Sequence, residues 1–279
     1  MAHFVWIASY PRSGNTWVRY FLTTLLLGPL EHSKQVEDIV PDIHARITAA
    51  HWFQPHHLFF LKTHWHYHPK MPLREDTVGV IYIVRHPLDI LCSALNVAIL
   101  TNTTWGLLNN TNYHPDMAPE LKKPIEQAFI NDFLQRGGLK RWQQQGMGSW
   151  AQNVSSWLSQ QSFHKLVLKY EDMLTSPEQF GAQINQFLQL GKTEAEVKAA
   201  VARASFTAMQ HLEAQEHEQR SGSLFPSHPN DLFREKRLKF VHKGQAHQWQ
   251  HHLTAAQVKR AQKVFAPVGE SLGYRFDSP

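Results

Sequence analysis

Residues 4–26 read FVWIASYPRSGNTWVRYFLTTLL, and this stretch decides the fold. Its first part, Phe4–Ser9, is a short apolar run of the kind that forms a buried strand. Residues 10–15 combine Pro, Ser, Gly and Asn, which favour a loop. From Val18 to Leu26 apolar residues recur at helical spacing. The pattern therefore predicts a strand, a loop and a helix in succession.

Three further apolar runs are typical of strands, namely His57–Lys62, Val78–Val84 and Leu166–Lys169. A helical pattern follows the second run and begins at Pro87, where the missing N–H of proline costs nothing. Strands that alternate with helices indicate a parallel sheet covered on both faces. We therefore expect a single α/β domain over residues 1–279, with a central parallel sheet flanked by helices.

The C-terminal part carries signals for helix starts. Thr193 with Glu196, and Thr254 with Gln257, have the residue types and spacing of capping boxes. Between residues 102 and 148 the periodicity weakens, and the stretch is rich in Asn, Gln, Pro and Gly. Long irregular connections in compact domains are usually functional or disordered. We expect residues 102–148 to be an insertion that forms a lid over a binding site.

The composition narrows the class of protein. Of the 279 residues, 42% are hydrophobic and 18% are charged, which suits a folded chain with a sizeable core. The net charge of +5 favours anionic ligands, and no run of five basic residues suggests a nucleic-acid-binding tail. The N-terminus lacks the positive region of a signal peptide, and Tyr20–Leu30 is too short an apolar stretch to span a bilayer. We expect a cytoplasmic protein that binds neither nucleic acid nor membrane, with Cys92 as a buried apolar residue.

The loop after the first strand has the features of a phosphate cradle. Backbone N–H groups at a helix N-terminus lack partners, and the helix dipole adds positive character there. Gly14 lets the backbone approach an anion closely, while Thr16 adds a hydroxyl and Arg12 a fixed charge. An ordinary strand-to-helix turn is the alternative. The loop is not a Walker A loop, since Ser9 stands in place of the first Gly and no Lys follows Gly14.

Two further segments offer groups that bind phosphate. Arg85 ends a predicted strand, and Ser93 lies two turns into the following helix, so that a guanidinium and a hydroxyl can grip one anion. Pairing of Arg85 with Asp89 is the alternative. Lys243-Gly244, followed by Trp249, can hold a phosphate through an ammonium and backbone N–H groups. A solvated basic loop is the alternative there.

Together and in this order, the three segments resemble the cytosolic-type sulfotransferases that use 3′-phosphoadenosine 5′-phosphosulfate (PAPS). In that family the first loop typically reads YPKSGTTW and is P-loop-like. The resemblance implies that the 5′-phosphosulfate is bound by the residues of the matching loop, Arg12, Ser13, Gly14, Asn15, Thr16 and Trp17. It implies that Arg85 and Ser93, eight residues apart, hold the 3′-phosphate. It also implies that His242, Lys243 and Gly244, which occupy the positions of Arg-Lys-Gly in the family's RKGxxGDW, close over the nucleotide.

Smaller segments extend the resemblance over nearly the whole chain. Lys62-Thr63-His64 matches the family's Lys-Thr-His, in which the His is the catalytic base. Tyr170 begins a Tyr-Glu-Asp-Met segment, and Ser205-Phe206 is similar to the family's Ser-Phe; both segments lie near the adenine in that family. The resemblance also supports stacking of Trp17 on the adenine.

Several residues depart from the family's pattern. Arg12 stands in place of the usual Lys, and a planar guanidinium does not place its charge where an ammonium does. His242 stands in place of an Arg, and His247-Gln248 in place of Gly-Asp. The dimerisation motif of many animal members is not evident, so both monomer and homodimer stay open. These departures indicate a divergent, microbial member of the family.

The resemblance implies an enzyme that moves the sulfuryl group of PAPS to a hydroxyl or amine of a small-molecule acceptor. His64 would be the general base, and Lys62 and Arg12 would stabilise the leaving phosphate. Divergence suggests a specialised metabolite as the acceptor, and Trp52, Trp65 and Trp105 are candidates for its pocket.

Three other functions stay open at this point. A small-molecule or nucleoside kinase on a related scaffold is one, although the Walker A Lys is missing. A non-catalytic nucleotide-binding module and a basic nucleic-acid binder are the others. A metal site on His64, His66 and His68 is not expected, because structural zinc sites typically use cysteines and Cys92 is the one cysteine.

Overall fold

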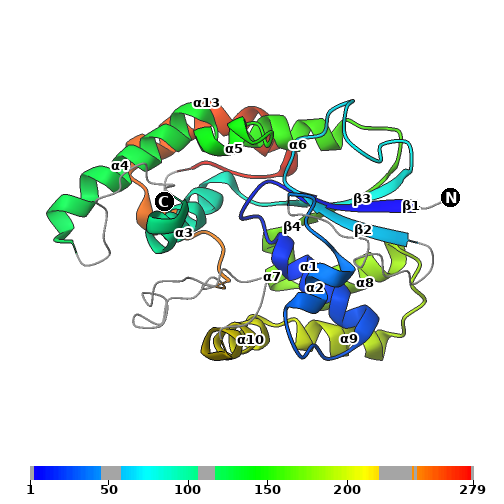
Figure 1. Ribbon diagram of the computed structural model, residues 1–279. Helices are drawn as coiled ribbons and strands as arrows, with labels where there is room; N and C mark the ends of the chain where they lie inside the picture. Colours follow the sequence, from blue (N-terminus) through cyan, green and yellow to red (C-terminus); the bar gives the residue numbers. More distant parts are fainter. Residues whose placement is uncertain (1–2, 45–57, 106–116, 220–240, 242–243, 278–279) are drawn as a thin grey trace.

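The computed structural model describes residues 3–44, 58–105, 117–219, 241 and 244–277, with the side chains of residues 100–105 and 217 left aside. Parallel strands form a four-stranded sheet in the order β2-β1-β3-β4 (Figure 1). The strands are β1 (His3–Ser9), β2 (Leu58–Thr63), β3 (Thr77–Val84) and β4 (His164–Lys169). The helices are α1 (Asn15–Leu27), α2 (Lys34–Ile39), α3 (Pro87–Trp105), α4 (Pro119–Arg136), α5 (Lys140–Gln144), α6 (Trp150–Leu158), α7 (Tyr170–Thr175), α8 (Pro177–Phe187), α9 (Glu194–Arg203), α10 (Phe206–Gln219), α12 (Trp249–His252) and α13 (Ala255–Gly269), with a final 3-10 turn at Glu270–Leu272.

The first strand lies inside the sheet, because β1 pairs with both β2 and β3. Ile7 is the register partner of Lys62 on one side and of Ile81 on the other. Alternate side chains of β1 enter two separate cores, with Trp6 in one and Ile7 in the other. The predicted strands are thus confirmed, and β4 begins slightly earlier than predicted, at His164.

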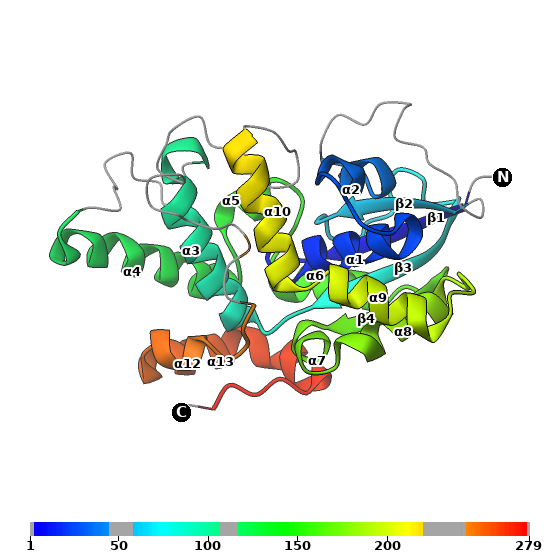
Figure 2. The same cartoon turned by 90° about the horizontal axis from the view of Figure 1, so that it is seen from below.

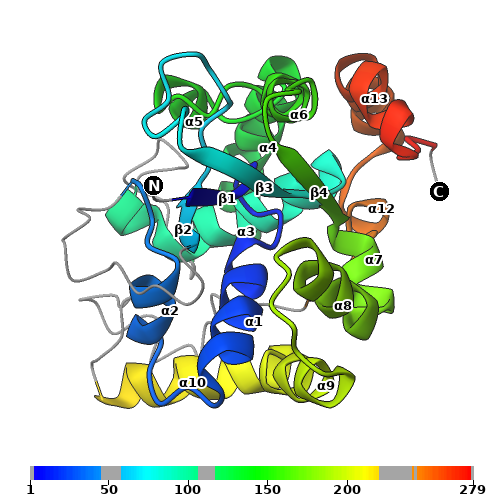
Figure 3. The ribbon, with the colours of Figure 1, turned by 90° about the vertical axis from the view of Figure 1, so that its right-hand side faces the viewer.

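Helices cover both faces of this sheet, as the single α/β domain predicts. Helices α4, α5, α6 and α13 lie over one face, and α1, α2, α8 and α9 lie over the other (Figure 3). Helices α3 and α4 extend beyond the carboxyl ends of the strands (Figure 2). In open parallel sheets this is the edge at which ligands bind.

The predicted helix starts are confirmed at α9 and α13. In both capping boxes the Thr hydroxyl accepts from the backbone N–H of the third helical residue, whose side chain in turn accepts from the backbone N–H of the Thr. Residues 102–148, where the sequence pattern is weak, include the end of α3, all of α4 and all of α5. Helix α4 even contains Pro124 in its interior. The lid function of this stretch stays a prediction.

Candidate functional site

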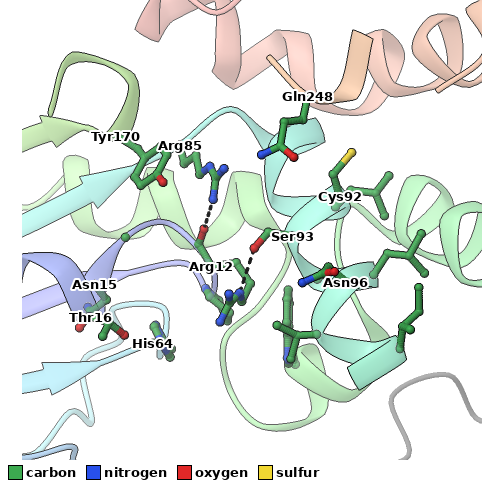
Figure 4. Close-up of a pocket in the computed structure, with 18 of the residues that line it drawn as sticks. Arg12, Asn15, Thr16, His64, Arg85, Cys92, Ser93, Asn96, Tyr170 and Gln248 are labelled. Carbon is green, nitrogen blue, oxygen red and sulfur yellow. Dashed lines mark hydrogen bonds between the residues drawn. The ribbon is translucent and has the colours of Figure 1, made fainter. Parts of the chain in front are cut away.

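A single cavity of about 860 Å³ lies at the carboxyl ends of β1, β2 and β3. It brings together most of the residues that the sequence predicts for the site. Those that line it are Arg12, Gly14, Asn15, Thr16, Trp17, Lys62, His64, Arg85, Ser93, Tyr170, Phe206 and Gly244. Figure 4 shows several of them facing one another across the space between the loop after β1 and helix α3.

The loop after β1 is tightly folded. Arg12 and Gly14 both have left-handed backbone conformations, with φ of 67° and 100°. A Cβ on Gly14 would lie 2.7 Å from a ring carbon of Tyr170, so only glycine allows this approach. Asn15 anchors the loop, since its Nδ2 donates to the carbonyl of Ile7 at 3.0 Å. Within the described residues, the buried Oγ of Ser13, which is not part of the cavity lining, and Oδ1 of Asn15 have no hydrogen-bond partner.

The two guanidinium groups of the site meet across this loop. Arg12 Nε donates to Ser93 Oγ at 3.1 Å, and Arg85 Nη1 donates to the carbonyl of Arg12 at 2.9 Å (Figure 4). The guanidinium of Arg85 also lies over the ring of Tyr170, 4.0 Å from its centroid. Burial, followed by the nearby charge of Arg85, lowers the pKa of Arg12 to about 10, so Arg12 is cationic at neutral pH.

Asp89 of α3 and Arg85 hold the segment that leads into α12. The carboxylate of Asp89 accepts from the backbone N–H groups of His247 at 2.7 Å and Trp249 at 3.4 Å. Arg85 instead donates to the carbonyl of Gln245 at 3.0 Å, so the structure does not support its predicted alternative pairing with Asp89. His247 has a φ of 61°, a conformation that suits the Gly typical of the resembled family at this position better than a histidine. The backbone shape is thus compatible with the family's motif despite the changed residue.

His64 is held in one tautomer. Its Nδ1 lies 2.9 Å from the carbonyl oxygen of Ser9, and a carbonyl can only accept, so Nδ1 carries the proton. The lone pair of Nε2 is then the basic one. Burial, and next the charge of Lys62, lower the pKa of His64 well below its usual value, which keeps the ring neutral.

A hydrogen-bond network around Lys62 and His64 includes three residues that were not foreseen from the sequence. Lys62 Nζ lies 2.7 Å from Asp42 Oδ2. His44 Nε2 accepts from the backbone N–H of His64 at 3.0 Å, and Asn153 Nδ2 donates to the carbonyl of His64 at 2.9 Å. These contacts fix the backbone as well as the ring of His64. No sequence signal singled out Asp42, His44 or Asn153.

Aromatic rings line the cavity beside the anion cradle. The ring centroid of Trp17 lies 4.9 Å from that of Phe206 and 6.1 Å from that of Tyr170. A Cβ on Gly244 would come within 2.7 Å of the Phe206 ring, so this glycine lets the chain pass close to it. Flat apolar surfaces of this kind are suited to a purine base.

The cavity has two chemically different ends. We call the part formed by Arg12, Thr16, Lys62, His64, Arg85 and Ser93 the polar end. We call the part formed by Leu91, Leu95, Ile99, Ile130, Trp142, Met147 and Leu253 the apolar end. The apolar end comes from α3, α4, the α5 region and the residue after α12. Its residues were not predicted individually, because they share no local motif.

Other predicted residues lie elsewhere. The hydroxyl of Ser205 accepts from the backbone N–H of Ala208 at the start of α10 and is not part of the cavity lining. Trp65 packs edge-on against His44, with centroids 4.8 Å apart, also away from the lining. His242, Lys243, Trp52 and the side chain of Trp105 fall outside the described part of the chain.

Cys92 corrects the expectation of full burial. It is half-buried and faces the cavity from α3. Burial raises the pKa of its thiol to about 12, so the thiol stays protonated at neutral pH.

Within the described residues, no group of three or more His, Cys, Asp or Glu is placed to hold a metal ion. Strand β2 ends at Thr63, so His64, His66 and His68 do not continue it. His66 donates from Nδ1 to the carbonyl of Gly146 at 2.7 Å. Among the helices that the structure describes, none is long and apolar enough to cross a bilayer.

Comparison with known proteins decides the family. The model of the sulfotransferase domain family matches residues 3–273. The chain belongs to the sulfotransferase family. This membership favours the sulfotransferase interpretation of the loop after β1 over the kinase one. It also agrees with the order in which the three phosphate-binding segments occur.

Relatives and solved structures agree with this membership. The chain is 23% identical to the amine sulfotransferase of Oryctolagus cuniculus over 94% of its length and 79% of that protein. It is 29% identical to the 3-beta-hydroxysteroid sulfotransferase of Cavia porcellus over 67% of its length, a match that spans only 54% of that relative. The fold is similar to mouse sulfotransferase SULT7A1 complexed with PAP, with a TM-score of 0.62, 18% identity, and coverage of 98% of this chain and 85% of that chain.

Proposed function

We propose that this sulfotransferase moves the sulfuryl group of PAPS to a hydroxyl or amine of a small-molecule acceptor, with His64 as general base. The observation that carries the proposal is the single cavity that unites an anion cradle, two guanidinium groups and a neutral histidine. A binding module has no use for a fixed base, so the orientation of His64 supports an enzyme.

The polar end fits the nucleotide. The loop amides at the start of α1 and the hydroxyl of Thr16 suit the 5′-phosphosulfate. Arg85 and Ser93 suit the 3′-phosphate, because a guanidinium and a hydroxyl that both contact Arg12 line the same cavity. Trp17, Tyr170 and Phe206 suit the adenine.

The chemical step follows from the position of His64. The donor supplies the sulfuryl group and leaves as 3′-phosphoadenosine 5′-phosphate (PAP). The acceptor oxygen or nitrogen forms the new bond to sulfur while the bond from sulfur to the bridging phosphate oxygen breaks and leaves its electron pair on that oxygen. His64 Nε2 takes the acceptor's proton. Lys62 and Arg12 stabilise the charge that develops on the phosphate.

The apolar end fits the acceptor. Leu95 and Ile99 of α3 face it from one side, and Ile130 and Trp142 come from α4 and α5. Helices α4 and α5 belong to the predicted lid, residues 102–148, which supports a role of this stretch in acceptor binding. The same elements also contribute Asn96, Glu126, Gln127, Arg141 and Gln145 to the cavity lining. Such a pocket suits an acceptor that has an apolar body and carries polar groups besides the reactive hydroxyl or amine. The specialised metabolite, the oligomeric state and the cytoplasmic location stay predictions.

Calorimetric titration with PAP tests the nucleotide assignment. Adenosine 5′-phosphosulfate, which lacks the 3′-phosphate, and ATP with Mg²⁺ serve as controls. We expect micromolar binding of PAP, about −8 kcal/mol, and at least tenfold weaker binding of both controls. Equal binding of all three would contradict the roles of Arg85 and Ser93, and tight binding of ATP alone would favour a kinase.

An acceptor screen with PAPS tests the reaction. Phenols, aliphatic alcohols and amines with apolar bodies are incubated with the enzyme, and sulfated products are detected by mass spectrometry. Formation of a product in step with PAP release supports the proposal. Tight PAP binding without transfer to any acceptor class would favour a non-catalytic module.

A further inference from the structure

The segment that carries Asp42 is attached to the edge of the sheet at Lys62. The backbone N–H of Lys62 donates to the carbonyl of Pro41 at 2.9 Å, and that of Ile43 donates to the carbonyl of Lys62 at 3.0 Å. These bonds make an isolated parallel bridge that pairs Asp42 with Lys62. Backbone hydrogen bonds therefore hold Asp42 beside Lys62.

Both oxygens of the Asp42 carboxylate are engaged. Oδ2 lies 2.7 Å from Nζ of Lys62, and Oδ1 accepts from the backbone N–H of His44 at 3.0 Å. The side chain of Lys62 is only 9% exposed, and that of Asp42 is 23% exposed. Lys62 and His64 both line the cavity, and His44 binds the backbone of His64. The carboxylate thus holds the lysine and, through His44, contacts the base.

We propose that Asp42 is a positioning residue that fixes Lys62 as a cation at the polar end, next to His64. This inference rests on the proposed function, in which the charge of Lys62 stabilises the leaving phosphate. It assigns Asp42 a task distinct from donor binding, because its carboxylate is an anion and would repel a phosphate. Its task is to keep the neighbouring charge in place and to keep it protonated.

The charges around Lys62 agree with this task. Burial lowers the pKa of Lys62, and Asp42 is the first group that raises it again. Arg19 of α1 and Glu37 of α2 also act on Lys62, but they form their own ion pair at 2.9 Å and oppose each other. Lys62 is the main cause that holds the pKa of Asp42 at about 2, against the opposing effect of burial, so this carboxyl is ionised across the physiological range. His44, with a pKa lowered to about 4 mainly by burial, adds no positive charge there.

Loss of the Asp42 carboxylate should lower the pKa of Lys62. Without the carboxylate, the effect of burial on Lys62 is no longer offset, so the ammonium loses its proton at lower pH. In Asp42→Asn, the alkaline limb of kcat against pH should therefore move to lower pH, by about one unit. At neutral pH we expect kcat to fall about tenfold, the loss that corresponds to 1.4 kcal/mol of transition-state stabilisation. The affinity for PAP should change less than threefold at that pH, about 0.65 kcal/mol.

The experiment compares the wild type, Asp42→Asn and Asp42→Glu, with Asp38→Asn as matched control. Asp38 pairs with Lys34 on the exposed surface of α2, so its loss should leave every readout unchanged. The readouts are the pH profile of kcat, calorimetric titration with PAP, and the NMR titration of Lys62 in protein labelled with ¹³C at lysine Cε. Asp42→Glu keeps the charge but displaces it, so we expect a reduced kcat with the alkaline limb left in place.

The outcomes separate this inference from the proposed function. A shifted alkaline limb together with an earlier titration of the Lys62 resonance in Asp42→Asn supports it. Unchanged limb and resonance would overturn it, even if kcat fell. If Asp42→Asn does not fold, the wild-type spectrum still decides, because a neutral Lys62 at pH 7.5 would overturn the inference. Absence of sulfuryl transfer in the wild type would overturn the proposed function instead, and the lysine resonance would still report on the ion pair.

Discussion

The two ends of the cavity are built on different principles. At the polar end, Lys62 lies in β2, Arg85 follows β3 directly and Arg12 lies in the loop after β1, so all three lie at the carboxyl ends of neighbouring parallel strands. At the apolar end, the walls come from helices that only tertiary packing brings together. The polar end is therefore rigid, and its residues can be recognised from short sequence motifs. The apolar end can change its shape without disturbing the sheet. This difference is suited to an enzyme that keeps one donor and varies its acceptor.

Removal of the base tests the polar end most severely. In His64→Ala we expect kcat to fall by about 10²- to 10⁴-fold, because the imidazole that takes the acceptor's proton is lost. Affinity for PAP should stay within a few-fold of the wild type. Steady-state kinetics and calorimetry check the two parts. His211→Ala, at an exposed position on α10, is the control and should behave like the wild type. Retained turnover in His64→Ala would remove the base from the mechanism.

Gly14→Ala sharpens the claim that the polar end is rigid. The left-handed φ of 100° and the 2.7 Å approach of Tyr170 both penalise a methyl group. We expect a loss of stability on the order of 1–3 kcal/mol from the backbone alone, with at least tenfold weaker PAP binding from the displaced loop. Gly28→Ala is a matched control, because its φ of 89° is similarly strained but nothing lies within 4 Å of the added methyl. The temperature of thermal unfolding should fall in both variants, whereas the affinity for PAP should fall only in Gly14→Ala. Equal PAP affinity in both would argue against a tightly fitted cradle.

Leu95→Ala tests whether the apolar end acts on the acceptor alone. Leu95 is half-buried on α3 and lines the cavity, so its truncation enlarges the apolar end without opening the core. We expect KM for an apolar acceptor to rise about tenfold, the effect of about 1–3 kcal/mol of lost contact. PAP affinity should not change. A parallel loss of donor affinity would break the division between the two ends.

The pH profile gives the smallest and most specific test. The pKa of His64 lies well below its usual 6.5, mainly because burial disfavours the imidazolium. The basic form is then present at pH 6.5 and above, so the acid limb of kcat/KM should fall below pH 6.5. Leu95→Ala should leave this limb in place. An acid limb above pH 7, measured with buffers of constant ionic strength, would contradict the buried, neutral state of His64.

The same division explains what was predictable. The strands and the loop after β1 were predicted because strands and turns are local patterns, and the loop is continuous in sequence. The extent of α4 was not predicted, because its apolar residues follow no clear period and because Pro124 in its interior is typical of a helix end. Asp42 and Asn153 were missed because their roles depend on contacts with distant residues, such as the bond from Asn153 to His64. No local pattern marks a residue whose partner lies far along the chain.

The position of β1 has a consequence for how the chain folds during synthesis. This strand precedes β2 and β3 in the chain, yet it lies between them, and Ile7 must wait for Ile81 to pair on one side. Parallel pairings between distant segments form slowly, because the loop must close before its contacts contribute. Until β3 emerges, the apolar run FVWIAS has an unpaired edge that is open to pairing with other chains. The strand is thus synthesised before both of its neighbours but can be completed on both sides only after β3 has been synthesised.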